Sequence, residues 1–490
     1  MKCLRLFAFL CVYFRPLSAA DDPAAQIEQE LKKIAGIYAA VESESADPIP
    51  VEIAIYQGAI PGMLRTLDPH SVFFDPDQFE QLQQMQSSER KGFGTVVSLL
   101  PGRVIVLQSL EGSPSAKAGL SAGDEILGIN TIPVRYLDVE QLTQLLTEAR
   151  QKEATLDVRK PGNEGLTQIK MSPALLDAPT VDRAFMISPG IAYLRITSFE
   201  QPTGQLVKQT IEKLGAEYLK GLIVDLRDNP GGAVQSAAET AALFLSPDQV
   251  IFSIRGRATK PEQVAVPKDS KPYTFPIAIL INGKSASASE IVTGALQDHD
   301  RAVVLGEPSY GKGLVQQVFP LSASSGLALT TAFYYTPSGR SIQKPLSGGQ
   351  LDAATVMARG PFQSDSGRPL PGGGGIKPDE IVYPEQQSRL QSVLDASGSL
   401  TSFAGEYLRN HTVGDDGQVS SEMLDQLKVF LAERSIQPGV ADWLSNRDWI
   451  ANRLQEEILT LKFGVARGDE IALRRDPAVQ TAVRKLRGAP

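Results

Sequence analysis

The spacing of apolar residues changes several times along this chain. Between residues 24 and 90, apolar side chains recur every three or four positions, which predicts helices. From 90 to 170, short apolar runs alternate with glycine-containing turns, which is typical of strands. From 176 to 385, strand-like runs alternate with helical patterns, which predicts an α/β domain. From 387 to the end the pattern is helical again, so we expect an α/β multidomain protein with helical regions at both ends.

Two apolar runs of the α/β segment end in dense polar motifs. The predicted buried strand Ile277–Ile281 precedes Asn282-Gly-Lys-Ser-Ala-Ser-Ala-Ser-Glu290, and residues 288–297 then have helical spacing. The next apolar run, 303–305, precedes a glycine-rich turn with one lysine at 306–313. A serine between a buried strand and a helix N-terminus has amides nearby that stabilise negative charge. Together the two motifs predict a Ser-Lys hydrolase.

Two further segments have a biased composition. Residues 344–377 are rich in Gly, Pro and Ser, which predicts a mobile surface loop. The stretch from Arg474 to Arg487 is basic, and we interpret it as a solvated helix face.

The strand-rich segment carries the pattern Ala118-Gly-Leu-x-x-Gly-Asp-x-Ile126, and a helix capped by Asp138 follows it. About eighty residues here resemble a circularly permuted PDZ domain of bacterial proteases. The resemblance implies that the amides of Gly92, Phe93 and Gly94 bind the terminal carboxylate of a peptide, which adds as a strand beside the helix. The alternative is that the two glycines only form a turn.

The composition of the chain argues against several classes of function. The chain has 490 residues with 42% hydrophobic and 21% charged side chains, which is typical of a soluble multidomain protein. Its net charge of −8 and the lack of a basic stripe argue against nucleic-acid binding. Its cysteines are Cys3 and Cys11, and its histidines (His70, His299, His411) lie far apart, so we expect no disulfide, metal site or cofactor.

The first twenty residues differ from the rest. Lys2 and Arg5 precede an apolar run at 6–14, and small residues at 18–20 follow it, which predicts a secretory signal peptide. The alternative is an unprocessed N-terminal anchor. We therefore expect export to a bacterial periplasm, with association with the inner membrane as a variant of this prediction.

Several motifs occur together in a fixed order. In addition to the PDZ pattern they are Leu67-Asp-Pro-His-Ser71, Asp225-Leu-Arg-x-Asn-Pro-Gly-Gly232, Ser285-Ala-Ser-Ala-Ser-Glu-Ile291, Gly306-Glu-Pro-x-Tyr-Gly-Lys-Gly313 and Gly375-Ile-x-Pro-Asp379. From residue 24 to about 385 the chain resembles the C-terminal processing (tail-specific) peptidases, serine peptidase family S41. This implies a crotonase/ClpP-like α/β protease core with an inserted PDZ domain, and a serine endopeptidase that cleaves proteins near or from their C-termini.

The resemblance also assigns roles to single residues. It implies Ser287 as the nucleophile, Lys312 as the general base, and Gln316 as the residue that orients the lysine amine. Serine needs a base to become a nucleophile. A lysine that acts as this base needs its pKa lowered from about 10.4 to roughly 7–8, which burial without a carboxylate partner achieves.

The resemblance places the oxyanion hole at the amide of Ala288 and at that of Gly231 or Gly232. His299 is the competing base, but it lies at the far end of the predicted helix, roughly 16 Å along its axis, and should not reach the serine. Asp298 matches a position linked to activity in the family, and a structural salt bridge is the other interpretation.

Partners and alternatives follow from the same motifs. We expect substrates with free apolar C-termini, and an adaptor protein and a homodimer are candidates. The runner-up function is a non-catalytic PDZ-type protein that holds exposed C-termini, and a third is a crotonase-type enzyme, for which fold analogy supplies no coenzyme site. The expected organisation is a signal peptide (1–20), a helical region (21–85), a PDZ domain (86–172), a peptidase core (173–385) and a C-terminal helical region (386–490).

Overall fold

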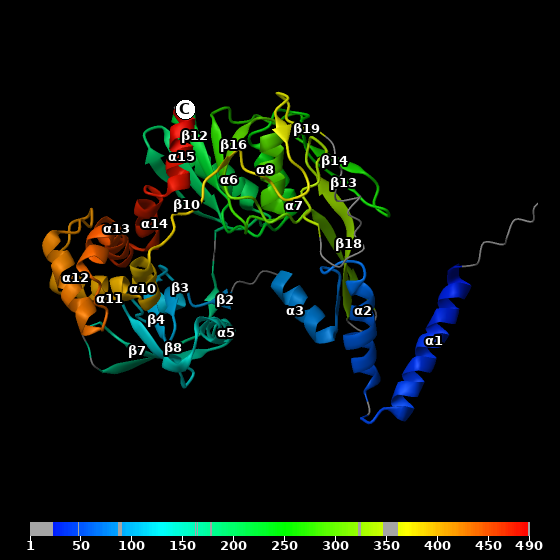
Figure 1. Cartoon of the computed structure of the whole chain (residues 1–490), viewed down its shortest axis with the longest axis horizontal. Helices are drawn as coiled ribbons and strands as arrows, with labels where there is room; N and C mark the ends of the chain where they lie inside the picture. Colours follow the sequence, from blue (N-terminus) through cyan, green and yellow to red (C-terminus); the bar gives the residue numbers. More distant parts are fainter. Residues whose placement is uncertain are drawn as a thin grey trace, which may run out of the picture.

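The computed structural model describes residues 23–47, 49–86, 91–161, 163, 165–176, 179–321, 325–345 and 361–488 (Figure 1). The predicted signal peptide (1–20) lies outside these ranges. Within them, no helix combines the length and apolar character needed to cross a membrane. The protein is a mixed α/β multidomain molecule with helical segments at both ends, as the sequence predicts.

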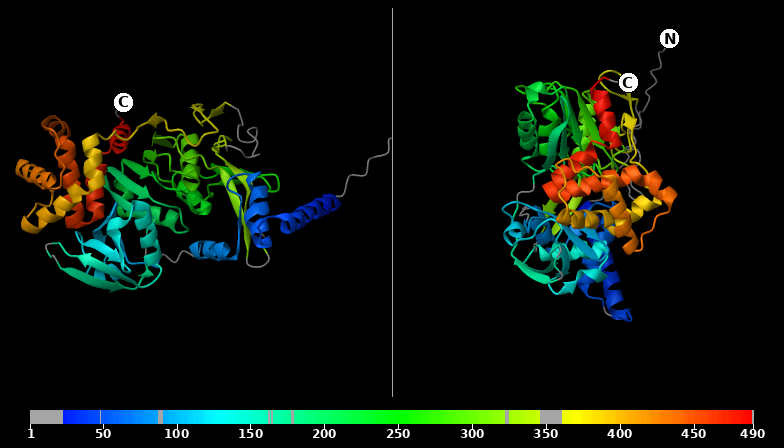
Figure 2. Two further views of the ribbon diagram at one scale, coloured as in Figure 1. Left: turned by 60° about the horizontal axis from the view of Figure 1, so that its bottom comes forward. Right: turned by 90° about the vertical axis from the view of Figure 1, so that its left-hand side faces the viewer.

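The N-terminal region is helical up to the turn at Asp68. There the Asp68 carboxylate accepts hydrogen bonds from the amides of His70 and Ser71, which ends the helix. A short strand that the sequence did not predict follows, and it pairs with strand β18 of the core. The first helix projects from the body of the molecule in Figures 1 and 2. The elements are α1 (Pro23–Glu44), η1 (Ile53–Ala59), α2 (Ile60–Arg65), β1 (Val72–Phe74) and α3 (Pro76–Gln86).

A second unit contains an antiparallel sheet in the order β3-β4-β5-β7-β8 and one long helix, α5. Helix α5 begins at the predicted cap, since the Asp138 and Gln141 side chains exchange hydrogen bonds with each other's amides. The elements are β2 (Lys91–Gly92), β3 (Thr95–Leu100), β4 (Arg103–Ser109), α4 (Pro114–Lys117), β5 (Glu125–Ile129), β6 (Ile132–Pro133), η2 (Val134–Tyr136), α5 (Val139–Ala149), β7 (Ala154–Arg159), β8 (Leu166–Met171) and β9 (Ala174–Leu175).

The core is built on a sheet in the order β10-β11-β12-β15-β16-β21, which is parallel from β11 onward. Helices α6, α7 and α8 pack their apolar faces against one side of it. The strands are β10 (Val181–Ser188), β11 (Ile191–Ile196), β12 (Gly221–Asp225), β15 (Ile277–Ile281), β16 (Ala302–Gly306) and β21 (Glu380–Ile381). The helices are α6 (Thr203–Lys213), η3 (Ala216–Tyr218), α7 (Val234–Ala242) and α8 (Ala288–Asp298).

A second core sheet is antiparallel. Strand β18 is its centre and pairs with β17 on one side and with β1 and β13 on the other. The elements are β13 (Val250–Arg255), β14 (Glu262–Ala265), β17 (Leu314–Pro320) and β18 (Gly326–Tyr335). Because β16 belongs to the first sheet and β17 to the second, the 306–313 turn joins the two sheets.

The prediction of a mobile surface loop at 344–377 is wrong for its second half, and residues 346–360 lie outside the described ranges. Residues 361–377 contain the hairpin β19 (Phe362–Gln363) and β20 (Pro369–Leu370), and Ile376 is fully buried in the core cluster. The amide of Gly375 donates to Ile342 O. Gly375 has a φ of +83°, and a Cβ there would lie 2.7 Å from Ser309 O. Glycine is therefore needed here so that the backbone can approach Ser309 closely, and not to make the segment mobile.

The C-terminal region is helical and the basic side chains at its end are exposed, both as predicted, but its last helix also has a buried apolar face that the sequence analysis did not name. Ala478, Val479 and Ala482 of α15 are buried against the side of the main sheet that α6–α8 leave open (Figure 1). The Arg474 guanidinium donates to Ile187 O. The elements are α10 (Arg389–Ser397), α11 (Ser399–Asn410), α12 (Ser421–Glu433), α13 (Val440–Phe463), α14 (Val465–Leu473) and α15 (Pro477–Leu486).

Candidate active site

Ser287 lies on a strained turn between β15 and α8. Its φ of 54° and ψ of −112° fall outside the regions that L-residues ordinarily adopt. Strain of this kind persists only where the surroundings impose it, and it is concentrated at functional sites. The Ser287 amide donates to Glu290 Oε2 at 2.9 Å. The turn therefore holds a half-buried serine directly before the first turn of a buried helix.

The two neighbouring serines have a structural role. The Ser285 hydroxyl donates to Leu226 O at 2.7 Å, and the Ser289 hydroxyl donates to Asn229 O at 3.1 Å. Both side chains are fully buried. They fasten the Ser287 turn to the segment that follows β12.

That segment, the 227–232 turn, approaches Ser287 closely. A Cβ on Gly231 would lie 2.9 Å from both Ser287 Cβ and Ala288 N, so only glycine fits there. The Gly231 amide is already engaged, because it donates to Asn229 Oδ1 at 2.9 Å. For Gly232 and Ala288, no hydrogen bond from the amide is found within the described residues. Of the two glycines predicted for the oxyanion hole, Gly232 is therefore the one whose amide has no hydrogen-bond acceptor within the described residues.

Lys312 lies in the turn between β16 and β17, and Glu290 fixes this turn as well. The amides of Gly311 and Lys312 donate to the Glu290 carboxylate at 2.7 and 2.9 Å, and the Ser309 hydroxyl donates at 2.5 Å. The Ser287 and Lys312 amides share one oxygen, Oε2, so their nitrogens lie no more than twice 2.9 Å apart. The structure thus brings the two predicted turns together.

Glu290 is a residue whose role the sequence analysis missed. It stood in the quoted serine motif, but its function was not assigned. A glutamate three residues after a serine at the start of a predicted helix is a capping-box pattern, and this is the signal that could have identified it. Burial raises the pKa of its carboxyl, and the hydrogen bonds from Ser309 and from the amides of Lys312, Ser287 and Gly311 oppose that effect.

The Lys312 side chain is half-buried and lies near the 68–71 turn. Burial lowers the pKa of His70, and the nearby positive charge of Lys312 lowers it further. The described residues include no ion-pair partner for Lys312. Among the described residues Gln316 makes no hydrogen bond with Lys312. Its Nε2 donates to His70 O at 2.8 Å, and its Oε1 has no donor within the same residues.

Asp298 and His299, at the far end of α8, are both engaged elsewhere. Asp298 forms a fully buried ion pair with Arg340 at 2.7 Å and accepts from the Ser338 amide, which agrees with the salt-bridge interpretation. The His299 ring contacts Val250 O and the Asp365 carboxylate, each at 2.8 Å. Both nitrogens of the imidazole therefore have partners away from Ser287.

The Gly92-Phe93-Gly94 loop precedes β3, next to helix α5. Its carbonyls are occupied, since Ser115 N donates to Phe93 O and Leu110 N donates to Gly94 O. Gly94 has a φ of +74°, and a Cβ there would lie 2.3 Å from Ser113 Cβ. No hydrogen bond from the Phe93 or Gly94 amide is found in the part of the chain that the structure describes.

Comparison with known proteins identifies related sequences. A family model described as peptidase family S41 matches residues 190–354, and one described as PDZ domain matches residues 105–160. A carboxy-terminal-processing protease of Bartonella bacilliformis is 34% identical over 323 residues, which are 64% of this chain and 73% of that protein. A carboxy-terminal processing protease of Bacillus subtilis is 30% identical over 67% of this chain and 70% of its own length.

The solved structure of a photosystem II D1 C-terminal processing protease covers 73% of this chain and 87% of its own, at 22% identity and a TM-score of 0.43. The fold and the two family matches define a PDZ-containing α/β protein of the peptidase class. Because the match to the Bartonella protein spans most of that relative, the chain belongs to peptidase family S41.

Proposed function

We propose that this protein is a serine endopeptidase that cleaves proteins near or from their C-termini, with the substrate tail held by the PDZ domain. One observation supports the catalytic part: a single oxygen of Glu290 accepts from the backbone amides of both Ser287 and Lys312, so the backbones of the proposed nucleophile and base are close together. The names of the two relatives, both carboxy-terminal processing proteases, support the reaction type.

In the proposed reaction, Ser287 Oγ attacks the peptide carbonyl while Lys312 Nζ, unprotonated, takes the hydroxyl proton. The amides of Ala288 and Gly232 donate to the negative oxygen of the tetrahedral intermediate. Lys312 then gives its proton to the leaving amine, which produces an acyl-enzyme. A water molecule, deprotonated by Lys312, hydrolyses this ester and frees the serine.

Two features of the lysine environment favour its role as a base. The side chain is half-buried, so it remains open to a bound peptide. Within the described residues no carboxylate pairs with it. Gln316 is fixed by His70 O, and its Oε1, which accepts no bond from the described residues, can orient the lysine amine.

Capture of the tail is supported by the loop before β3. Its amides at Phe93 and Gly94 have no partner within the described residues, and exposed Lys91 adds a positive charge for an anion. A peptide that pairs with β3 beside α5 would present its carboxylate to these amides.

The test uses a peptide substrate with an apolar C-terminus, as the free acid and as the amide. Ser287→Ala and Lys312→Arg should each reduce kcat for the acid by at least about 1,000-fold, because alanine cannot attack and a guanidinium cannot accept the proton. Amidation should raise the KM of the unaltered protein about tenfold or more, since a neutral end loses the charge-assisted bonds to the loop.

Lys284→Arg is the matched control, since Lys284 belongs to the same serine motif but its side chain is exposed. It should cleave like the unaltered protein. Near-normal cleavage by Lys312→Arg would contradict the dyad, and equal KM values for acid and amide would contradict capture by the loop.

A further inference from the structure

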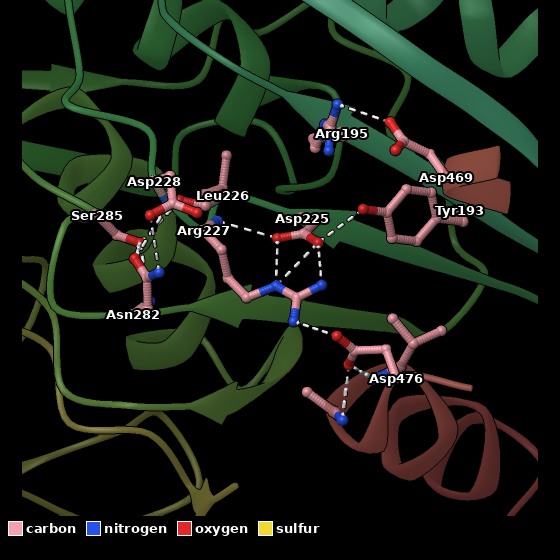
Figure 3. A network of polar contacts seen from close by, with 12 residues as sticks. Tyr193, Arg195, Asp225, Leu226, Arg227, Asp228, Asn282, Ser285, Asp469 and Asp476 are labelled. Atoms are coloured by element: carbon pink, nitrogen blue, oxygen red, sulfur yellow. Dashed lines mark hydrogen bonds and ion pairs between the residues drawn. The ribbon is translucent and has the colours of Figure 1, made fainter. Parts of the chain in front are cut away.

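A network of charged side chains lies where β12 ends (Figure 3). Asp225, the last residue of β12, is almost fully buried. Its carboxylate accepts from the Tyr193 hydroxyl at 2.7 Å and from Arg227 Nε and Nη2 at 3.0 and 2.6 Å. Arg227 therefore folds back onto the strand that leads into the 227–232 turn.

The same guanidinium reaches the C-terminal helix. Arg227 Nη1 donates to Asp476 Oδ2 at 2.7 Å, and Asp476 Oδ1 accepts from the amides of Ala478 and Val479 at 2.9 Å each. Asp476 is the N-cap of α15, so one of its oxygens caps the helix and the other binds Arg227. A helix that lies about 250 residues further along the chain is in this way joined to the start of the turn.

On this side the turn borders a cavity of about 450 Å³, and Arg227, Asp228 and Asp476 are among the residues that line it. Two carboxylates fix the guanidinium there, since Asp225 binds Nε and Nη2 and Asp476 binds Nη1. Of these two contacts, the ion pair with Asp476 is the one that joins the guanidinium to the C-terminal helix. On the opposite side, Asp228 N and the Asn282 side chain are bonded, as Figure 3 shows.

The turn needs support because its backbone is strained. Asp228, Gly231 and Gly232 have φ values of 58°, 99° and 141°. A residue other than glycine in the left-handed region costs free energy, about 1–3 kcal/mol, and keeps this conformation only when its surroundings fix it. The Gly232 amide, which we assign to the oxyanion hole, lies at the end of this strained segment.

We propose that Asp476 is a positioning residue for catalysis: through Arg227 it holds the 227–232 turn, and with it the oxyanion-hole amide, against the Ser287 turn. The C-terminal helix is then part of the active-site framework. This inference rests on the proposed peptidase function, but the contact it concerns can also be measured without cleavage.

The competing explanation is that α15 only covers the apolar side of the sheet. Ala478, Val479 and Ala482 would do this without any contact to Arg227. Asp476→Ser separates the two explanations, because serine is also a good N-cap but is too short to reach the guanidinium. The helix and its buried face are retained while the connection to the turn is lost.

Asp476→Ser should lower kcat about tenfold and leave KM within about twofold. Complete loss of one oxyanion-hole donor costs about 100- to 1,000-fold in kcat, and a displaced donor costs less. Lys485→Gln is the matched control, since it removes the ion pair of Lys485 with Glu380 at 3.0 Å near the other end of α15. It should leave kcat and KM unchanged.

Hydrogen–deuterium exchange provides the readout that needs no substrate. Exchange of the amides in residues 226–233 should rise several-fold in Asp476→Ser and remain as in the unaltered protein in Lys485→Gln. If the unaltered protein cleaves no peptide, the proposed function is wrong, and the exchange rates still decide whether Asp476 holds the turn. Exchange and kcat in Asp476→Ser that equal those of Lys485→Gln would overturn the inference.

Discussion

The Ser287 turn and the Lys312 turn are fixed in different ways. The Ser287 turn follows a central strand of the parallel sheet, and buried residues surround it. The Ser285 hydroxyl fastens it to Leu226, just before the 227–232 turn, and the Ser289 hydroxyl and the Ala286 amide fasten it to Asn229 of that turn. The Lys312 turn leads instead into β17, which pairs only with β18 among the described strands and whose side chains are largely exposed.

The lysine turn depends on residues from distant parts of the chain. Gly313 N donates to Gln343 Oε1, Lys344 N donates to Gly311 O, and Gln316 contacts the 68–71 turn. The serine half of the site is thus fixed by the core of one sheet, whereas the lysine half is fixed by contacts that converge from the N-terminal region and the 341–345 segment. We therefore expect substitutions far from the site to disturb the position of the Lys312 turn before that of the Ser287 turn.

Glu290 fixes both the Ser287 turn and the Lys312 turn, so we expect its replacement to have the largest effect on the site. In Glu290→Gln one oxygen becomes an NH₂ group, which faces the amides of Ser287 and Lys312 in one orientation and the Ser309 hydroxyl and Gly311 amide in the other. Each buried donor left unsatisfied costs about 1–3 kcal/mol. We expect kcat to fall at least 100-fold and Tm to fall by several degrees, measured by peptide cleavage and calorimetry.

Glu307→Gln is the control for this change. Glu307 lies in the glycine-rich motif that contains Lys312, and its carboxylate makes no hydrogen bond among the described residues. It should retain kcat and Tm. A Glu290→Gln variant with near-normal kcat would show that the two turns hold their positions independently.

Regular periodicity made much of the fold predictable. Helix α5 and its cap at Asp138, the strand Ile277–Ile281 and the helix after Ser287 lie where the spacing placed them. The strand β1 was missed because its three residues are too few to show a period. For helix α15 the sequence analysis considered only the basic residues. It overlooked an apolar stripe that is visible in the sequence, formed by Ala478, Val479, Ala482, Val483 and Leu486.

The site was predictable in part, because its motifs indicate residue types and not partners. The strained Ser287 turn and the close approach of Gly231 agree with what a strand-to-helix turn and a double glycine suggest. The bond of Gln316 to His70 O joins residues 246 positions apart, and no local pattern encodes such a contact. The role of Glu290 likewise depends on the Ser287 and Lys312 turns, which meet only in the folded chain.

Gln316 tests whether the lysine half depends on the N-terminal region, since its side chain connects the two. Gln316→Ala should lower kcat about tenfold by freeing both the lysine amine and the 68–71 turn, with little change in Tm because the side chain is exposed. Gln317→Ala, the next position on β17 and also exposed, should behave like the unaltered protein. Equal kcat values for the two variants would remove Gln316 from the site.

His299 tests whether the serine half is independent of remote contacts, because it lies at the end of α8 that is far from Ser287. Its ring contacts Val250 O and Asp365, so His299→Ala leaves a carbonyl without its partner and should cost about 1–3 kcal/mol of stability. If the serine half is fixed locally by the 227–232 turn, this loosening should not reach Ser287, and kcat should stay within about twofold below the lowered Tm. Thermal unfolding and cleavage rates measured on the same sample separate the two effects. A large loss of kcat in the folded variant would show that the serine half depends on the whole of α8, or that a histidine takes part in the reaction.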